Sequence, residues 1–320
     1  MEFPVTLKNQ IEARLSGMPL KKLADMTAQL SGRYRTESGA GKRIVTDETQ
    51  AAIYAAVRMP ATFGAVAAAL LYAIEAAGSF APHTLLDAGA GTGAATWAAA
   101  ELLTLSRADC LEREPVMRKL GAALTQHHPA ITDVHWIDAD LTDGALALPQ
   151  AELVIASYAL GELAEAARER AVLRLWEAAS GMLLLVEPGT PEGFRQLRAA
   201  RELLLRQGAH IAAPCPHSAS CPMGEGDWCH FTCRVARSRL HKQLKGGDAP
   251  FEDEKFTYLA ATKFPCEPAK ARVLRHPLTE KGLVSLTLCR TVGISAESIR
   301  KSHPAYKQAR KLSCGDAAQF

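Results

Sequence analysis

The chain has 320 residues, of which 48% are hydrophobic and 22% charged, and its formal net charge is +3. This length suits one large α/β domain with a modest appendage, and the composition excludes a chain dominated by disorder. The small net charge conceals a division, because residues 232–320 hold 17 Lys and Arg against 8 Asp and Glu, so polyanion binding is expected in the C-terminal third.

The N-terminal sequence MEFPVTLKNQIEARL mixes acids and bases and has no apolar core. It therefore resembles neither a secretory signal nor an Arg-rich transit peptide. Residues 61–80 form the most apolar stretch, but Glu75 and several small residues make it too weak for a membrane span. These features predict a cytoplasmic protein with no membrane partner.

The first 80 residues are predicted to be helical. Apolar residues recur at three-to-four spacing in IEARLSGMPLKKLADMTAQL, and TDETQAAIYAAVR begins with Thr46 or Asp47 as a plausible N-cap. Pro60 is expected to mark a helix boundary, after which FGAVAAALLYAIEAA forms another helix that leads into the first strand.

From residue 83 onward, short apolar runs alternate with amphipathic segments, which predicts a parallel sheet with helices on both faces. The strand candidates are HTLLDA, ADCLE, DVHWID, AELVIASY and GMLLLVEP, and the helix candidates are TGAATWAAAELL, PVMRKLGAALTQ, AEAARERAVLRLWEAA and GFRQLRAARELLLRQ. An irregular, cysteine-rich stretch follows from about Pro214 to Arg237, and FTYLAAT, ARVLRHPL and GLVSLTLCR then look like strands.

The expected organisation has four parts. They are a helical extension at 1–80, a Rossmann-like cofactor-binding domain at 81–210, a cysteine-rich insert with a basic segment at 211–245, and a basic β-rich region at 246–320 that completes the sheet.

A glycine loop follows the first of these strands in LLDAGAGTGAATW. The strand ends at Asp87, Gly89, Gly91 and Gly93 follow at alternate positions, and a helix begins near Ala94. Such glycines let the backbone approach a ligand, and the helix N-terminus offers unpaired N–H groups. The order D-x-G-x-G-x-G differs from the dinucleotide fingerprint and resembles motif I of class I S-adenosylmethionine methyltransferases.

Acids at the ends of the next two strands complete the expected cofactor site. Glu112, with Glu114 as the substitute, is expected to hold the ribose hydroxyls of S-adenosylmethionine, because a carboxylate accepts two O–H bonds. Asp138, with Asp140 as the alternative, is expected to meet the adenine amino group. The predicted fold is therefore a class I methyltransferase sheet with the helical extension, the cysteine insert and the C-terminal part added.

The catalytic residues stay unassigned. Amino-methylating enzymes of this class commonly carry an N/D-P-P-Y/F run after the fourth strand, whereas this chain has SYALGE at 157–162. A cytosine-C5 methyltransferase needs a nucleophilic cysteine, and neither ASYALGEL nor VEPGTPEG contains one.

Three cysteines form a C-x5-C-x7-C array at Cys215, Cys221 and Cys229. In a reducing compartment such a cluster indicates metal ligands rather than disulfides. Zinc ribbons usually supply close C-x2-C pairs, so an irregular cysteine loop with a distant fourth ligand favours an iron–sulfur cluster, with zinc as the competitor. The candidates for the fourth ligand are Cys289, Cys233, Cys266 and His230.

Several runs together resemble the small-ribosomal-subunit methyltransferase-like family, that of the mitoribosomal protein Rsm22 and its bacterial relatives. These runs are AAIYAAVRMPATFGAV, LLDAGAGTG, SYALGEL, LLLVEPGTPEGF, CPHSASCPMGEGDWCHF, SRLHKQLKG and FEDEKFTYLA. The resemblance implies a class I methyltransferase fold with a [4Fe-4S] cluster, held by Cys215, Cys221, Cys229 and Cys289. It also implies action on small-subunit ribosomal RNA or its precursor, as methyltransferase or assembly factor, with RNA rather than DNA as partner.

Residues 234–245 form a basic run, RVARSRLHKQLK, with no acid. A run of this kind next to the cysteines is expected to track RNA phosphates, and Lys301, Lys307, Arg310 and Lys311 extend the positive charge.

Overall fold

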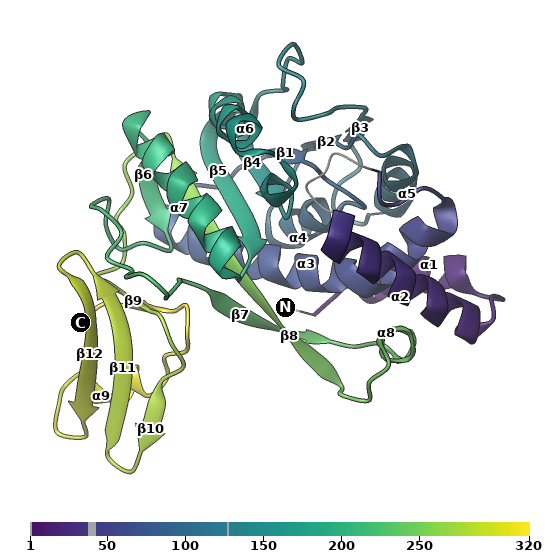
Figure 1. Ribbon diagram of the computed structural model, residues 1–320. Helices are drawn as coiled ribbons and strands as arrows, with labels where there is room; N and C mark the ends of the chain where they lie inside the picture. The colour runs from purple at the N-terminus through teal and green to yellow at the C-terminus, as the bar shows by residue number, and fades with distance from the viewer. Residues whose placement is uncertain (1, 38–42, 127) are drawn as a thin grey trace.

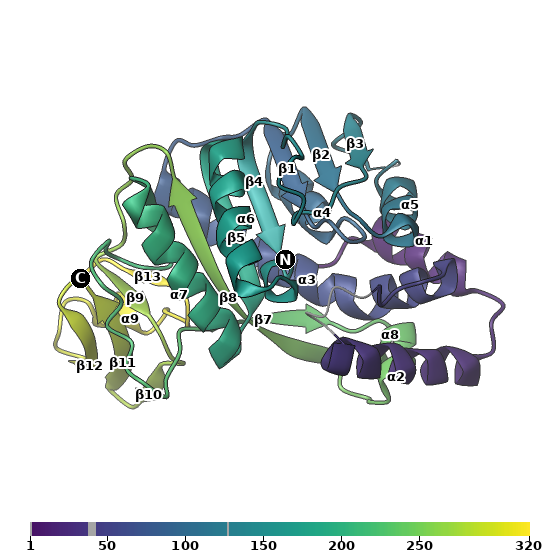
Figure 2. The same cartoon turned by 45° about the horizontal axis from the view of Figure 1, so that its top comes forward.

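The computed structural model describes residues 2–37, 43–126 and 128–320. The chain builds one large sheet with helices on both faces, and a smaller second sheet beside it (Figure 1). Two N-terminal helices, α1 (Val5–Leu15) and α2 (Leu20–Glu37), lie at the opposite end of the molecule from the second sheet (Figure 2).

The large sheet has the strand order β3-β2-β1-β4-β5-β8-β6, and β7 pairs with β8 outside this path. Strands β1 to β5 are parallel, and β8 is antiparallel to both neighbours. One reversed strand next to the final strand is the arrangement of class I methyltransferases, so the predicted fold class is confirmed. The strands are β1 (Thr84–Ala88), β2 (Arg107–Leu111), β3 (Val134–Ile137), β4 (Ala151–Ser157), β5 (Ala179–Pro188), β6 (His210–Ala213), β7 (Phe231–Ala236) and β8 (Phe251–Thr262).

Helices cover both faces because each central strand is apolar on both sides. On β5, Met182 and Leu184 face the core under α3 to α5, whereas Leu183 faces the core under α6 and α7. The helices are α4 (Ala94–Leu102), α5 (Pro115–Thr125), α6 (Glu165–Ala178) and α7 (Pro191–Arg206), with a short 3-10 turn η1 (Leu160–Glu162) after β4.

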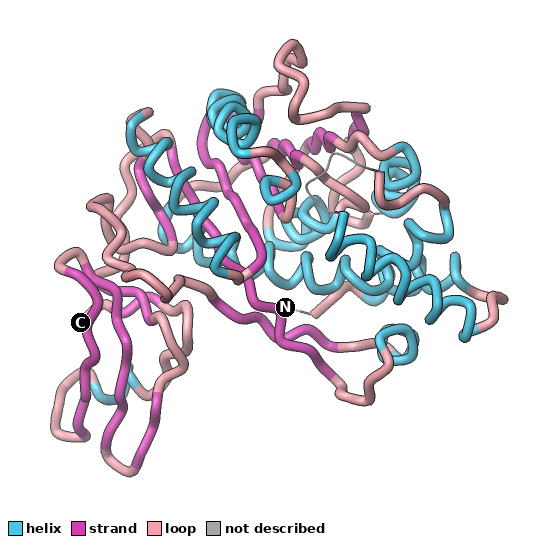
Figure 3. Tube along the Cα trace, viewed as in Figure 1, coloured by secondary structure: helices cyan, strands magenta, loops and turns pink. Residues whose placement is uncertain are grey.

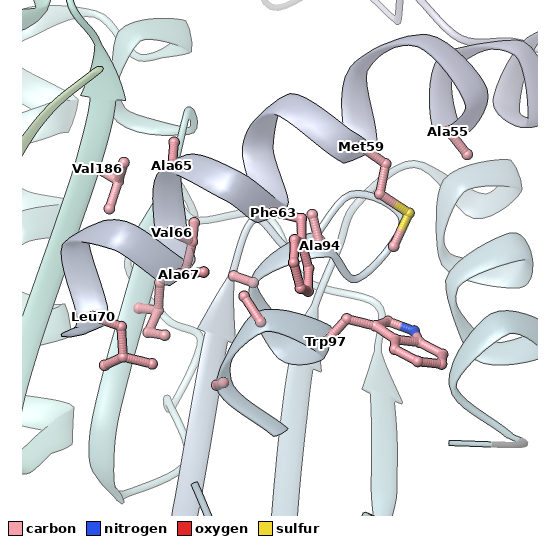
Figure 4. Close-up of a cluster of buried hydrophobic side chains, with 14 of the residues drawn as sticks. Ala55, Met59, Phe63, Ala65, Val66, Ala67, Leu70, Ala94, Trp97 and Val186 are labelled. Atoms are coloured by element: carbon pink, nitrogen blue, oxygen red, sulfur yellow. The ribbon is translucent and has the colours of Figure 1, made fainter. Parts of the chain in front are cut away.

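Helix α3 (Glu48–Ala77) runs across the sheet as one continuous element of 30 residues. Its N-cap is Asp47, whose side chain accepts a hydrogen bond from Gln50 N at 2.8 Å. The predicted boundary at Pro60 is wrong, because the buried residues on both sides of it, such as Met59 and Phe63, pack against α4 and keep the helix whole (Figure 4). Helix α3 has the length and composition of a membrane span, yet 72% of its most apolar window is buried inside the protein.

The second sheet contains most of the C-terminal region. Of residues 246–320, β8 joins the large sheet, and the later strands pair among themselves in the order β10-β11-β9-β13, with β12 on β11. The elements are β9 (Ala271–Val273), β10 (Leu278–Glu280), β11 (Leu283–Arg290), β12 (Gly293–Arg300), α9 (Tyr306–Ala309) and β13 (Ala317–Ala318).

The cysteine-rich insert is more regular than expected. Its second half forms β7 and the short helix α8 (Arg239–Lys245), because residues 231–236 pair with the start of β8. The irregular part is the loop of residues 214–230, which connects β6 to β7 near the second sheet (Figure 3).

Candidate cofactor and metal sites

The glycine loop turns sharply between β1 and α4. Gly89, Gly91 and Gly93 have φ values of 73°, 58° and 88°, in the left-handed region that favours glycine. A Cβ at Gly89 would stand 2.8 Å from the Cβ of Ala159, so glycine is also required there by the close approach of the loop after β4. The loop and the N-terminus of α4 thus form one wall of a cavity.

Asp87 lies beneath this loop and not on the cavity wall. Its Oδ2 accepts hydrogen bonds from the backbone N–H and the hydroxyl of Thr96, at 3.0 and 2.8 Å. Burial raises the pKa of Asp87 to about 6, although the bonds from Thr96 oppose the shift. Asp87 therefore ties β1 to α4 and supports the glycine loop from beneath.

Glu112, at the end of β2, does line the cavity. Its Oε2 accepts a hydrogen bond of 2.8 Å from Gly91 N, and its Oε1 accepts one of 2.7 Å from Glu114 N. Burial raises the pKa of this carboxyl. Each carboxylate oxygen can accept a second hydrogen bond, so Glu112 can still receive two ligand hydroxyls.

The two acids after β3 lie in different surroundings. The side chain of Asp138 is 71% exposed and pairs with Arg118 at 2.9 Å, outside the cavity. Asp140 lines the cavity and lies 3.6 Å from Arg113. Asp138 therefore faces solvent and Arg118 of α5, whereas Asp140 faces the cavity, which favours the alternative residue for the adenine contact.

Helices α2 and α3 supply the cavity wall that the sequence did not reveal. Tyr34 and Tyr54 have ring centroids 5.4 Å apart and line both this cavity, of about 120 Å³, and an adjoining one of about 550 Å³. Tyr158 and Glu162 also border both spaces. The cofactor cavity therefore continues into a larger space at the ends of β4 and β5.

Acidic and amide groups line this larger cavity. Burial raises the pKa of Glu187 to about 7, while the backbone amides of Leu160 and Gly161 oppose the shift. Gln196 donates through Nε2 to Glu192 at 2.7 Å, which leaves its buried Oε1 without a partner among the residues described. Tyr158 has a φ of 56° and donates its hydroxyl to Glu254 at 2.8 Å. This space has the acceptors to receive a ligand that carries N–H groups.

A third cavity, of about 50 Å³, contains the predicted metal ligands in its lining. Cys215, Cys221 and Cys229 reach it from the loop of residues 214–230, and Cys289 reaches it from β11. Burial raises the pKa of Cys229 well above its usual value, and the charges of Cys215, Cys289 and Cys221 add to the shift. The structure thus brings these four thiols together, although in the described part of the chain no three His, Cys, Asp or Glu side chains are grouped as the ligands of a metal ion.

The other candidates for a fourth ligand lie elsewhere. Cys233 lies on β7 near Gly64, Cys266 lies 3.6 Å from the hydroxyl of Thr262, and the ring of His230 stacks on Trp228 with centroids 5.3 Å apart. None of these three candidates lines the cysteine cavity, whereas Cys289 does.

Two buried arginines line the same cavity, and sequence reasoning did not identify them. Arg201, on α7, is 3% exposed, and Arg272, on β9, is 2% exposed. Arg201 appears in the sequence only as one of several arginines on an amphipathic helix, so no signal distinguished it.

Three of the five cations in the basic run beside the cysteines are paired with acids. Arg234 pairs with Asp253 at 2.9 Å, and Lys245 pairs with Glu252 at 2.7 Å, because β7 and α8 lie against the acidic start of β8. Arg237 also lies 4.0 Å from Glu252. The expectation that residues 234–245 track phosphates is therefore weakened, since the acids that balance this run follow it in the sequence.

Comparison with curated proteins finds similar chains among mitochondrial ribosome proteins. The chain is 28% identical over 287 residues to the human ribosome assembly protein METTL17, which covers 82% of this chain and 61% of that protein. It is 24% identical over 364 residues to Rsm22-cox11 tandem protein 2 of Schizosaccharomyces pombe, which covers 97% of this chain and 48% of that protein. The chain thus spans about half to three fifths of the length of these relatives.

Two of the solved structures with a similar arrangement are named methyltransferases. One is magnesium protoporphyrin IX methyltransferase from Synechocystis with bound SAM, at 12% identity and a TM-score of 0.43, covering 75% of this chain and 97% of that one. Another is a putative RNA methyltransferase from Pyrococcus horikoshii, at 12% identity and a TM-score of 0.41, covering 63% of this chain and 84% of that one. The fold class itself rests on the strand order of the large sheet.

A sequence profile of the family described as mitochondrial small ribosomal subunit Rsm22 matches residues 48–319, which include the glycine loop, the cysteine loop and the second sheet. The family description and both relatives are mitochondrial, so the prediction of a cytoplasmic protein is wrong and the findings point to the mitochondrion. The resemblance inferred from the sequence is confirmed, and the chain belongs to the Rsm22 family.

Proposed function

We propose that this protein binds S-adenosylmethionine and a [4Fe-4S] cluster and acts in the assembly of the small ribosomal subunit, as an rRNA methyltransferase or as an assembly factor. The observation that carries this proposal is the cavity between the glycine loop and Glu112 in a methyltransferase-type sheet. The relatives support the ribosomal part, since one is named a ribosome assembly protein and the family is named for the small subunit.

The residues around the glycine loop fit S-adenosylmethionine. Glu112 would accept the ribose hydroxyls, and Asp140 would accept the adenine amino group. The N–H groups at the start of α4 would face the carboxylate of the methionine part, since a helix N-terminus favours an anion. When bound, the cofactor would supply an electrophilic methyl group.

The cysteine cavity also fits an anionic sulfur-bound group. Four thiols line it, and two buried guanidinium groups stand in its wall. A buried cation is unfavourable without a nearby negative charge, and thiolates around a cluster or a zinc ion would supply that charge. The spacing of the cysteines favours the cluster, and zinc is the alternative.

A second candidate function is a non-catalytic RNA-binding module in which cofactor and cluster only stabilise the fold. The sequence SYALGE after β4 favours it, because no Pro-Pro run is present to hold an acceptor amine.

RNA binding is assigned to the second sheet rather than to the basic run of residues 234–245. Exposed cations gather on and next to β12 without ion-pair partners in the described part of the chain, whereas Arg234, Arg237 and Lys245 of the basic run are paired with acids of β8. These cations are Lys281, Arg300, Lys301, Lys307, Arg310 and Lys311.

The experiment that separates the two functions has three readouts on anaerobically purified protein. Calorimetry measures S-adenosylmethionine binding, chemical analysis measures iron, sulfide and zinc, and labelled cofactor measures methyl transfer to small subunits from cells that lack the protein. Binding with about four irons and four sulfides and with transferred label supports the enzyme. Binding without label supports the module, and loss of both cofactor binding and metal contradicts both functions.

A further inference from the structure

Arg201 has unused hydrogen-bond donors that point to a ligand in the cysteine cavity. Its Nη2 donates to the carbonyl oxygens of His217 and Ala219, both at 2.8 Å. Its Nε and Nη1 are buried and have no hydrogen-bond partner among the residues described. Buried donors without partners are rare in folded proteins, so these two N–H groups indicate an acceptor in the cavity. The thiol of Cys215 is the side chain of this lining that interacts with Arg201, which places the acceptor on the sulfur side of the cavity.

No carboxylate balances the charge at this place. In the described part of the chain, neither Arg201 nor Arg272 has an acidic group within ion-pair distance. The side chains that share the cavity lining with the two arginines include four thiols, Cys215, Cys221, Cys229 and Cys289. The cavity wall thus holds two positive charges beside four groups that become anionic when they bind a metal.

The two arginines differ in their unused hydrogen-bond donors. Arg272 uses Nε for the carbonyl oxygen of Pro214 and Nη1 for that of Gly315, each at 2.8 Å, so it serves the cavity mainly as a charge. Arg201 keeps Nε and Nη1 free. Arg201 is therefore the residue that can donate N–H bonds to a group in the cavity.

We propose that Arg201 donates N–H···S hydrogen bonds to a cluster held by the four cysteines and raises its reduction potential. This inference rests on the proposed cluster. In the redox titration an added reductant such as dithionite would supply one electron to the cluster, no bond would form or break, and the guanidinium of Arg201 would stabilise the added negative charge. Hydrogen bonds and charge near cluster sulfurs are established determinants of cluster potential.

The test compares Arg201→Gln with Arg206→Gln in the full chain, purified without oxygen. Arg206 is the matched control because it lies on the same helix, is exposed and does not line the cavity. Iron and sulfide are measured first, and a redox titration followed by electron paramagnetic resonance then gives the midpoint potential. The potential is expected to become more negative in Arg201→Gln and to stay unchanged in Arg206→Gln.

Arg201 also anchors the cysteine loop, so Arg201→Gln could lose the cluster. Arg201→Lys is the second variant, because lysine retains the positive charge but lacks the several N–H donors of the guanidinium. The reduction potential of its cluster should lie below that of the wild type. If both Arg201 variants keep an intact cluster with an unshifted potential, the role of Arg201 is overturned and the proposed cluster stands. Wild-type protein without iron and sulfide overturns the proposed cluster and, with it, this role.

Discussion

The carboxylate of Glu187, at the end of β5, accepts a hydrogen bond of 2.9 Å from the backbone N–H of Leu160, the first residue of the turn after β4. This bond joins the ends of two neighbouring strands at the larger cavity. Because Glu187 is 1% exposed, burial raises its pKa to about 7, and its charge state changes in the neutral pH range.

Glu187 makes stability depend on pH with a defined sign. The folded-state pKa of about 7 lies above the ordinary value of 4.5, so the folded state is stabilised by protonation, and stability falls as pH rises through this window. The free energy of unfolding falls by an amount on the order of 3 kcal/mol as Glu187 ionises. Glu187→Gln removes the ionisable group and with it this fall, so the stability of the variant relative to wild type should increase between pH 4.5 and pH 8.

Urea unfolding at the two pH values measures this difference. Glu192→Gln is the control, because Glu192 lies nearby on the surface and its pKa is lowered by Arg195. A relative stability of Glu187→Gln that does not change with pH would contradict a raised pKa.

The two acids after β3 give a direct test of the cofactor site. Asp140→Asn should weaken S-adenosylmethionine binding, because Asp140 lines the cavity. A lost hydrogen bond to a charged group corresponds to about a tenfold or greater loss of affinity. Asp138→Asn should leave binding unchanged, because that side chain faces solvent and Arg118. Calorimetry measures the S-adenosylmethionine affinity of both variants. A loss of affinity in Asp138→Asn and none in Asp140→Asn would restore Asp138 as the adenine contact.

The central sheet could be predicted from the sequence because each strand is a short apolar run beside an amphipathic helix. Pro60 failed as a boundary because packing against α4 outweighs the loss of one helical hydrogen bond. Strand β10 has only three residues, and β12 alternates exposed and half-buried positions over most of its length, so neither had a buried run to indicate it. Both pair with β11.

The site was only partly predictable, for a similar reason. Glycine spacing identified the loop, but only the folded structure shows that the backbone N–H and the hydroxyl of Thr96 donate hydrogen bonds to Asp87. Tyr34 and Tyr54 reach the cavity from helices that precede the glycine loop, and no spacing in the sequence connects them to it. In contrast, Cys289 lies 60 residues beyond Cys229 and still reaches the same cavity, as the family resemblance implied.

Serine substitutions should separate the proposed ligands from the other cysteines. Cys221→Ser and Cys289→Ser should lower iron and sulfide content, because both thiols line the cavity. Cys233→Ser and Cys266→Ser should retain full content, since these side chains lie outside it. Metal analysis with visible absorption on anaerobic protein gives the result. If Cys289→Ser keeps its full iron content and Cys233→Ser loses iron, Cys233 and not Cys289 is the fourth ligand.

The second sheet should carry the salt-dependent part of RNA binding. Lys281, Arg300 and Lys301 are exposed at one end of the β11–β12 pair, where Lys301 N donates to Gly282 O at 2.8 Å. Changing these three residues to Gln should weaken binding of small-subunit RNA and reduce the slope of log affinity against log salt by about two.

The control for this variant removes the same charge at the opposite end of the molecule. It is the triple change of Arg14, Lys21 and Lys22 to Gln, which are exposed on α1 and α2. If RNA binding depended only on net charge, both triple variants would lose affinity equally and the second sheet would have no special role. A loss confined to the Lys281 variant requires that phosphates lie against β11 and β12, because counterion release reports only contacts that are formed.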